Sequence, residues 1–169
     1  LGDNRGAIAD SDRAIELDPR IANAYINRGA AKVNLGDNRG AIADLDRATE
    51  LDPRANAYRD RGAAKANLGD NQGAIADFDR AIELDPRIAK VYANRSQAKL
   101  NLGDDQGALA DSDRAIELDP RDASAYGNRG AAKLKLGDNR GAIADLDRAI
   151  ELDPRIANAY ANRGGAKSS

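Results

Sequence analysis

Asparagine side chains recur along the chain at a helical spacing. Asn23, Asn27 and Asn34 are separated by four and then seven residues, so they fall on one face of a helix. A carboxamide offers both a donor and an acceptor, so a row of them can pair with the N–H and C=O groups of an extended peptide whatever its side chains. Because asparagine weakens helices, its repeated use predicts a compensating role. The alternative is an inert polar face, copied with each repeat.

A second recurring set combines opposite charges. Asp44 lies beside the apolar stripe of its predicted helix, whereas Arg28 and Lys32 lie four residues apart on the preceding helix. We expect an ion-pair ladder in which each such aspartate meets an arginine or a lysine and joins neighbouring helices. The predicted ladder comprises Arg28, Lys32, Asp44, Arg61, Lys65, Asp77, Arg95, Lys99, Asp111, Arg129, Lys133 and Asp145.

The composition argues against most other chemistry. His and Cys are absent, which removes the usual zinc ligands, thiol nucleophiles and histidine acid–base catalysis. The aspartates are predicted on helix sides beside arginines rather than in a cleft, so we expect no enzyme, no catalytic residues, no metal and no cofactor. The net charge of −2 and the 4% aromatic content disfavour nucleic-acid binding. No membrane-spanning or targeting segment is evident, so we expect a soluble protein of unknown compartment.

An internal repeat must position both sets of side chains. Leu-Gly-Asp recurs at residues 1, 35, 68, 102 and 136, with spacings of 34, 33, 34 and 34. Such a period is typical of a solenoid in which each unit contacts only its neighbours. Within a unit, Gly36 suits the end of a first helix, Asp37 the start of a second helix, and Pro53 its end. The residue missing near Arg54 predicts one shorter connection.

The predicted organisation is a single all-α solenoid over residues 1–169. An orphan second helix at 1–19 precedes four whole helix pairs, and an orphan first helix at 155–169 follows them. The four pairs are expected at 20–53, 54–86, 87–120 and 121–154.

A unit of this length, with Tyr25, Gly29, Ala41, Leu45 and Pro53 at these positions, resembles the tetratricopeptide repeat (TPR). The resemblance covers all five units and implies a right-handed superhelical α-solenoid of antiparallel helix pairs. Some positions depart from the family pattern. Charged residues replace a Leu and a Tyr at the Arg28 and Lys32 positions, Ser96 replaces the tightly packed glycine, and Ser11 and Ser112 replace the large residue of the second helix.

In the TPR family, the first helices line a concave groove that holds extended peptides. The resemblance therefore implies a non-enzymatic protein–protein interaction module whose partner is a protein or peptide of unknown identity. The family's clamp for chaperone C-termini requires Lys and Asn at particular groove positions, so no chaperone-tail adaptor is expected. Those positions hold Ile26, Ala30, Arg59, Ala63, Ala93 and Gln97 here. The candidate groove residues are Asn23, Asn27, Asn34, Asn56, Arg59, Asp60, Asn67, Lys90, Asn94, Gln97, Asn101, Asn128, Lys135, Asn158 and Asn162.

The two predicted orphan helices leave an alternative function open. Residues 163–169 followed by residues 1–6 match an uninterrupted repeat, as in residues 28–40. One explanation is a piece of a longer repeat array. The other is a structural scaffold whose copies stack head to tail through their terminal helices, since a contact of that kind does not close on itself.

Overall fold

The computed structural model describes residues 3–168, which form ten α-helices and no strand. Leu1 and Gly2 of the first predicted turn, and Ser169 at the end of the last predicted helix, lie outside the described residues. The prediction of an all-α, solenoid-type chain of short helices is confirmed. We call α2, α4, α6, α8 and α10 the first helices, and α1, α3, α5, α7 and α9 the second helices.

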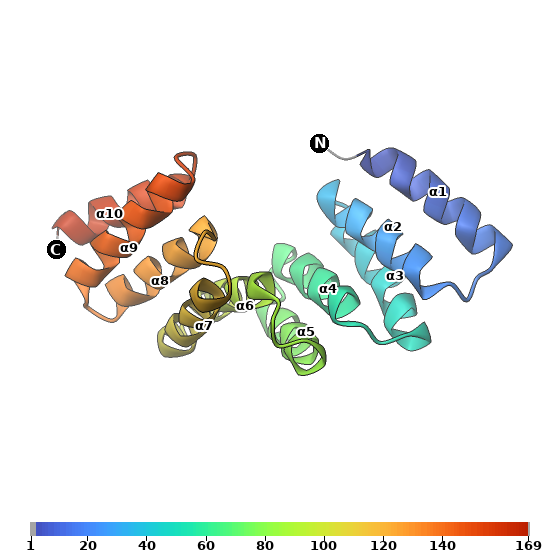
Figure 1. The fold of residues 1–169 in the computed structure, drawn as a ribbon, viewed down its shortest axis with the longest axis horizontal. Helices are drawn as coiled ribbons and strands as arrows, with labels where there is room; N and C mark the ends of the chain where they lie inside the picture. Colours follow the sequence, from blue (N-terminus) through green and yellow to red (C-terminus); the bar gives the residue numbers. More distant parts are fainter. Residues whose placement is uncertain (1–2, 169) are drawn as a thin grey trace. The chain divides into compact units, whose positions relative to one another are not determined.

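The chain divides into two compact units, and the first of them ends at Pro86. In this unit each helix packs against the next, and the first helices α2 and α4 also contact each other (Figure 1). The helices are α1 (Asn4–Leu17), α2 (Ala22–Asn34), α3 (Asn38–Leu51), α4 (Ala55–Asn67) and α5 (Asn71–Leu84).

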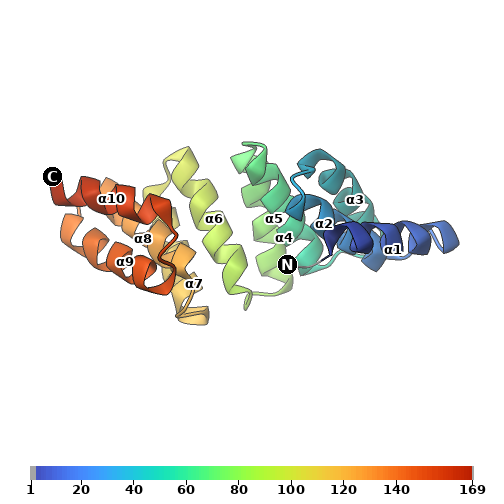
Figure 2. The same cartoon turned by 90° about the horizontal axis from the view of Figure 1, so that it is seen from above.

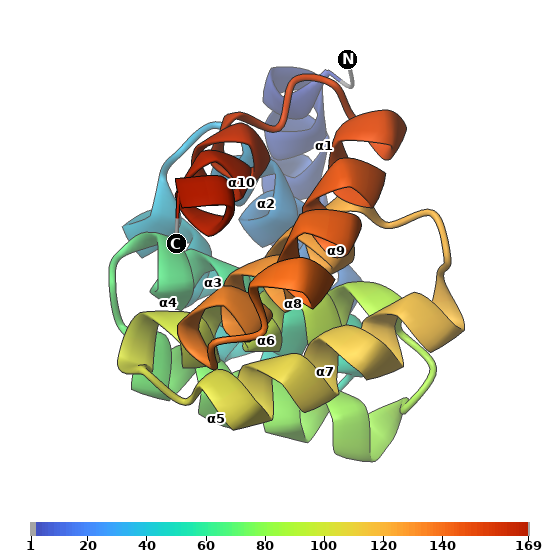
Figure 3. The same cartoon turned by 90° about the vertical axis from the view of Figure 1, so that its left-hand side faces the viewer.

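The second unit begins at Arg87 and repeats the arrangement in a different register. It contains α6 (Ala89–Leu102), α7 (Asp105–Leu118), α8 (Ala123–Lys135), α9 (Asn139–Leu152) and α10 (Ala157–Ser168). Here the first helix α8 contacts both α6 and α10, so three first helices form a continuous layer (Figure 2). The second helix α9 lies against both α8 and α10 (Figure 3).

Short polar motifs set the helix ends. Gly36 adopts a left-handed φ of 83° after α2, a conformation that costs glycine little. Asp37 then caps α3 by accepting a hydrogen bond from Gly40 N at 2.9 Å, and a Cβ at Gly40 would collide with this carboxylate. The connection from α3 to α4 contains only residues 52–54, whereas that from α1 to α2 contains residues 18–21, as the missing residue near Arg54 predicted.

Matched residue sizes fix the contact between a first helix and the second helix that follows it. A Cβ added to Gly29 would come within 2.7 Å of Leu45 Cγ, and Gly62 is equally close to Phe78. At the corresponding place in α6 and α7, Ser96 and Ser112 are both buried, with their hydroxyl oxygens 2.7 Å apart. Ser96 donates to the Ala108 carbonyl at 2.9 Å. The two serine departures from the repeat pattern therefore compensate each other in size and in hydrogen bonding.

Candidate functional site

Buried aspartates connect each first helix to the second helix that follows it. Asp44 is only 5% exposed and receives Arg28 Nε at 2.9 Å, Arg28 Nη2 at 2.5 Å and Lys32 Nζ at 2.8 Å. Each aspartate thus binds the arginine and the lysine together, where the sequence suggested one or the other. The equivalent sets are Arg61, Lys65 and Asp77; Arg95, Lys99 and Asp111; and Arg129, Lys133 and Asp145.

The ladder arginines make further contacts that the sequence did not indicate. Arg28 Nη1 donates to Asp12 on the preceding second helix at 2.6 Å, and its guanidinium lies 5.6 Å from the centre of the Tyr25 ring. Hydrogen bonding to Asp44, and to a smaller extent to Asp12, raises the pKa of Arg28, whereas burial lowers it. Asp145 likewise raises the pKa of Arg129. These arginines therefore stay cationic and tie three helices together.

Asp10 is the exception among the aspartates at this repeat position. It lies on α1 and is exposed, whereas its four counterparts on the later second helices are buried. Among residues 3–168, no first helix precedes α1, so neither an arginine nor a lysine meets Asp10. Asp10 therefore lacks the ion pairs that bury its four counterparts within the part of the chain that the structure describes.

Several predicted groove asparagines are used to join helices. Asn34 donates to Asn4 at 3.3 Å, and Asn67 donates to Asn38 at 3.1 Å, so each connects the end of a first helix to the start of the preceding second helix. Asn128 donates to the Ala93 carbonyl at 2.9 Å and thereby ties α8 to α6. These hydrogen bonds offset part of the helix-weakening effect of asparagine.

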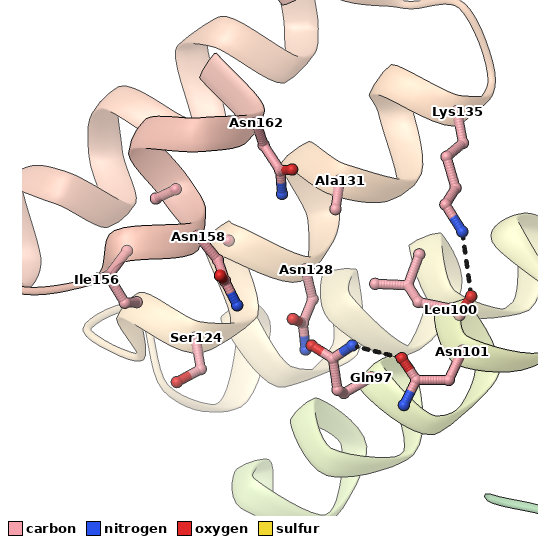
Figure 4. Close-up of a pocket in the computed structure, with 12 residues that line it drawn as sticks. Gln97, Leu100, Asn101, Ser124, Asn128, Ala131, Lys135, Ile156, Asn158 and Asn162 are labelled. Carbon is pink, nitrogen blue, oxygen red and sulfur yellow. Dashed lines mark hydrogen bonds between the residues drawn. The ribbon is translucent and has the colours of Figure 1, made fainter. Parts of the chain in front are cut away.

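The three first helices of the second unit enclose a pocket of about 400 Å³. Figure 4 shows the carboxamides of Asn158 and Asn162 on α10 pointing into it, on the side that faces α8. Neither side chain makes a hydrogen bond within the part of the chain that the structure describes. Six candidate groove residues line this pocket: Gln97, Asn101, Asn128, Lys135, Asn158 and Asn162.

The remainder of the pocket lining is apolar or small and was not among the candidate groove residues. Leu100, Ala131, Ile156 and Ala159 contribute apolar surface, and Ser124 and Gly127 complete the wall. Lys135 is the only charged residue in the lining, and its ammonium donates to the Leu100 carbonyl at 3.1 Å (Figure 4). The same ammonium lies 3.4 Å from Asp105 Oδ1. The pocket is therefore nearly neutral.

The other candidate groove residues lie outside this pocket. Asn23, Asn27 and Asn34 line a second pocket, of about 560 Å³, between α1 and α2. Arg59 and Asp60 form an ion pair with each other at 2.8 Å, and Asn56 accepts a hydrogen bond from Ala57 N. The residues outside the linings of both pockets are Asn56, Arg59, Asp60, Asn67, Lys90 and Asn94.

Within residues 3–168, no helix has the combination of length and apolar character that crossing a membrane requires.

No curated protein matches the chain in sequence. Similarity to solved structures is extensive. A crystal structure of MamA is 26% identical, covers 92% of each chain and superposes with a TM-score of 0.80. YrrB, described as a TPR protein with an unusual peptide-binding site, is 24% identical over 95% of this chain and 84% of its own, with a TM-score of 0.77. At this level of identity the similarity shows a shared fold and nothing further.

A shorter similar structure was solved with a ligand. The second TPR domain of human RPAP3, in complex with an HSP70 peptide, is 29% identical over 66% of this chain and 93% of its own, with a TM-score of 0.62. Two family models, each described as tetratricopeptide repeat, match the chain. One matches residues 28–88 and 60–123, and the other matches residues 97–163. Proteins of this family and fold are typically interaction modules and not enzymes. Together with the repeated helix pairs, these matches show that the chain belongs to the tetratricopeptide repeat family.

Proposed function

We propose that the groove formed by α6, α8 and α10 binds an extended peptide segment of a partner protein. The observation that carries this proposal is the pair of carboxamides, Asn158 and Asn162, that point into a partly apolar pocket without an intramolecular hydrogen bond among the described residues. Polar groups that converge on a concave, partly apolar surface are typical of a binding site.

The pocket chemistry favours recognition of the peptide main chain. Asn158 and Asn162 can each donate to a carbonyl and accept from an N–H, and Asn128 keeps its oxygen as an acceptor while its nitrogen holds Ala93. Leu100 and Ile156 supply apolar surface for one or two side chains. Because Lys135 is already engaged, we expect a modest preference for small apolar residues and none for acidic tails.

Relatives support the general mode of binding but not the same ligand. The RPAP3 domains were solved with HSP70 and HSP90 peptides, both of which end in Glu-Glu-Val-Asp. The clamp that such tails require is not met by the residues at the corresponding positions here, such as Gln97 in α6. We therefore expect an internal extended segment of a partner rather than a chaperone C-terminus.

A phage library of random peptides, selected against the chain, tests this proposal. We expect the selected peptides to lose about tenfold or more in affinity for the Asn158→Ala, Asn162→Ala variant, because two hydrogen bonds are removed. N-methylation of the peptide main chain should weaken binding to a similar extent. Fluorescence anisotropy measures both effects.

The matched control is Asn23→Ala, Asn27→Ala, which makes the same change at the equivalent positions of α2. Selected peptides should bind this variant as they bind the original chain. Equal losses in both variants, or full binding by the Asn158→Ala, Asn162→Ala variant, would contradict the proposed groove.

A further inference from the structure

Gly127 leaves a space between α8 and α10 that a side chain fills at the matching place in the first unit. In α2 this repeat position holds Ile26, which is 4% exposed and belongs to a buried cluster that includes Ala57 of α4. The helices α8 and α10 contact each other, as α2 and α4 do. Ala159 of α10 is the equivalent of Ala57, and it lines the pocket of about 400 Å³ together with Gly127.

Neither the backbone nor the packing of α8 requires a glycine at this position. Gly127 lies inside the helix and does not have a positive φ. A Cβ added to it would meet nothing within 4 Å, whereas one added to Gly130 on the same helix would lie 2.7 Å from Leu146 Cγ. Since a glycine inside a helix costs stability relative to alanine, the open space at Gly127 has a cost that a ligand filling it would offset.

A polar contact is also missing at this place. Asn128 donates to the carbonyl of Ala93, which lies 35 residues earlier in the chain. The equivalent bond would join Asn162 to the carbonyl of Gly127, yet Asn162 makes no hydrogen bond among the described residues. Its carboxamide points into the pocket instead (Figure 4). The empty side-chain position and the free carboxamide therefore occur at the same helix contact.

The lining of this space determines what would fill it. Leu100 and Ile156 supply apolar surface, and Ile156 has no counterpart before α4, where the connection is one residue shorter. The only charged lining residue, Lys135, already donates to the Leu100 carbonyl. An aliphatic side chain is therefore favoured over a charged one, and Ile26 in the first unit indicates its size, about four carbons.

We propose that Gly127 sets the specificity of the groove, because the space beside it receives one leucine or isoleucine side chain of the bound peptide. Asn162 then pairs with the peptide main chain next to that side chain. This inference rests on the proposed function, since it concerns the same groove, and it adds a side chain that main-chain recognition does not specify. Selected peptides should therefore share one leucine or isoleucine, beyond the general preference for small apolar residues.

Filling the space tests the inference. The Gly127→Ile variant copies Ile26, and the selected peptides should lose about tenfold or more in affinity for it, because their side chain no longer fits. Replacing the shared peptide residue by alanine should cost a similar factor on the original chain and little more on Gly127→Ile. Gly164→Ile, the same change on α10 outside the pocket lining, is the matched control and should bind as the original chain does. Fluorescence anisotropy measures each combination.

The melting temperature of the free chain provides a readout that needs no peptide. Gly127→Ile should raise it by a few degrees, because the variant removes a helix glycine and places apolar carbons in an unfilled space. A lowered melting temperature would overturn the inference, since the space would then not accept a side chain of this size. The same measurement shows that the variant is folded when its affinity is determined.

Failure of this inference differs from failure of the proposed function. Binding that depends on Asn158 and Asn162 but is unchanged by Gly127→Ile overturns the inference and leaves the proposed function standing. Selected peptides that share no leucine or isoleucine, or equal losses for Gly127→Ile and Gly164→Ile, have the same consequence. Full binding by the Asn158→Ala, Asn162→Ala variant contradicts the proposed function instead, and a library that yields no binder overturns both.

Discussion

The first unit contains three second helices and two first helices among the described residues, whereas the second unit contains three first helices and two second helices. Both are built from the same repeat, yet they leave different surfaces open. The second unit has a layer of three first helices with carboxamides in its pocket. The first unit has a pocket between α1 and α2, and its lining includes Asp10, which has no ion-pair partner among the described residues. The same repeat therefore supplies a pocket lined by carboxamides in one unit and a pocket that contains an exposed aspartate in the other.

The same side-chain type also has different roles in the two units. Asp145 is buried between Arg129 and Lys133, whereas Asp10 faces solvent. Gly130 lies against Leu146, whereas Gly164 has open space beside it. Asn128 holds α6, whereas Asn162 points into the pocket. Each of these pairs can be tested with matched substitutions, in which the repeat position is constant and only the covering helix differs.

The largest difference is expected for the aspartates. Asp145→Ala leaves Arg129 and Lys133 without their buried partner and should lower the free energy of unfolding by about 3 kcal/mol. Asp10→Ala should change it by less than about 0.5 kcal/mol, because the side chain is exposed. Urea unfolding followed by circular dichroism at low protein concentration measures both. Equal effects would show that the buried ladder contributes nothing specific to stability.

Glycine substitutions should give the next largest contrast. A Cβ at Gly130 would lie 2.7 Å from Leu146 Cγ and 3.2 Å from the Ala142 carbonyl oxygen, so Gly130→Ala should destabilise the chain by about 1–3 kcal/mol. Gly164→Ala meets nothing within 4 Å and should stabilise α10 by about 0.5–1 kcal/mol, because alanine favours the helix. Melting temperatures that shift in opposite directions would confirm the contrast, and a shared direction would refute it.

The smallest contrast concerns the carboxamides. Asn128→Ala removes the hydrogen bond to the Ala93 carbonyl and should cost about 1 kcal/mol of stability, partly offset by the better helix propensity of alanine. Asn162→Ala removes no intramolecular hydrogen bond among the described residues and should leave stability equal or slightly raised. Hydrogen exchange of the amides in α8 provides the readout. Faster exchange with Asn162→Ala than with Asn128→Ala would contradict the assigned roles.

Much of the fold could be predicted because local motifs carry it. Gly36 with Asp37, and Asp52 with Pro53, mark helix ends without any knowledge of packing. The pairing of Arg28 with Asp44 was also predictable, because the repeat fixes which faces meet. The apolar part of the pocket lining could not be predicted, since Leu100 and Ile156 come together only when α6, α8 and α10 are stacked. The tie from Asn34 to Asn4 was missed for the same reason, because it joins residues whose distance depends on helix crossing.

The paired serines of α6 and α7 have a consequence for how this chain can be rearranged by recombination. Ser96 and Ser112 lie on opposite sides of the Gly103 turn, so a crossover at that turn would join the first helix of one repeat to the second helix of another. A hybrid that sets serine against leucine would overfill the contact between the two helices, and one that sets glycine against serine would leave a cavity there. Crossovers after the Asp-Pro connections keep each pair intact. The unit that can be exchanged at α6 and α7 is therefore the whole helix pair and not the single helix, whereas the glycine–leucine pairs of α2 with α3 and of α8 with α9 match each other.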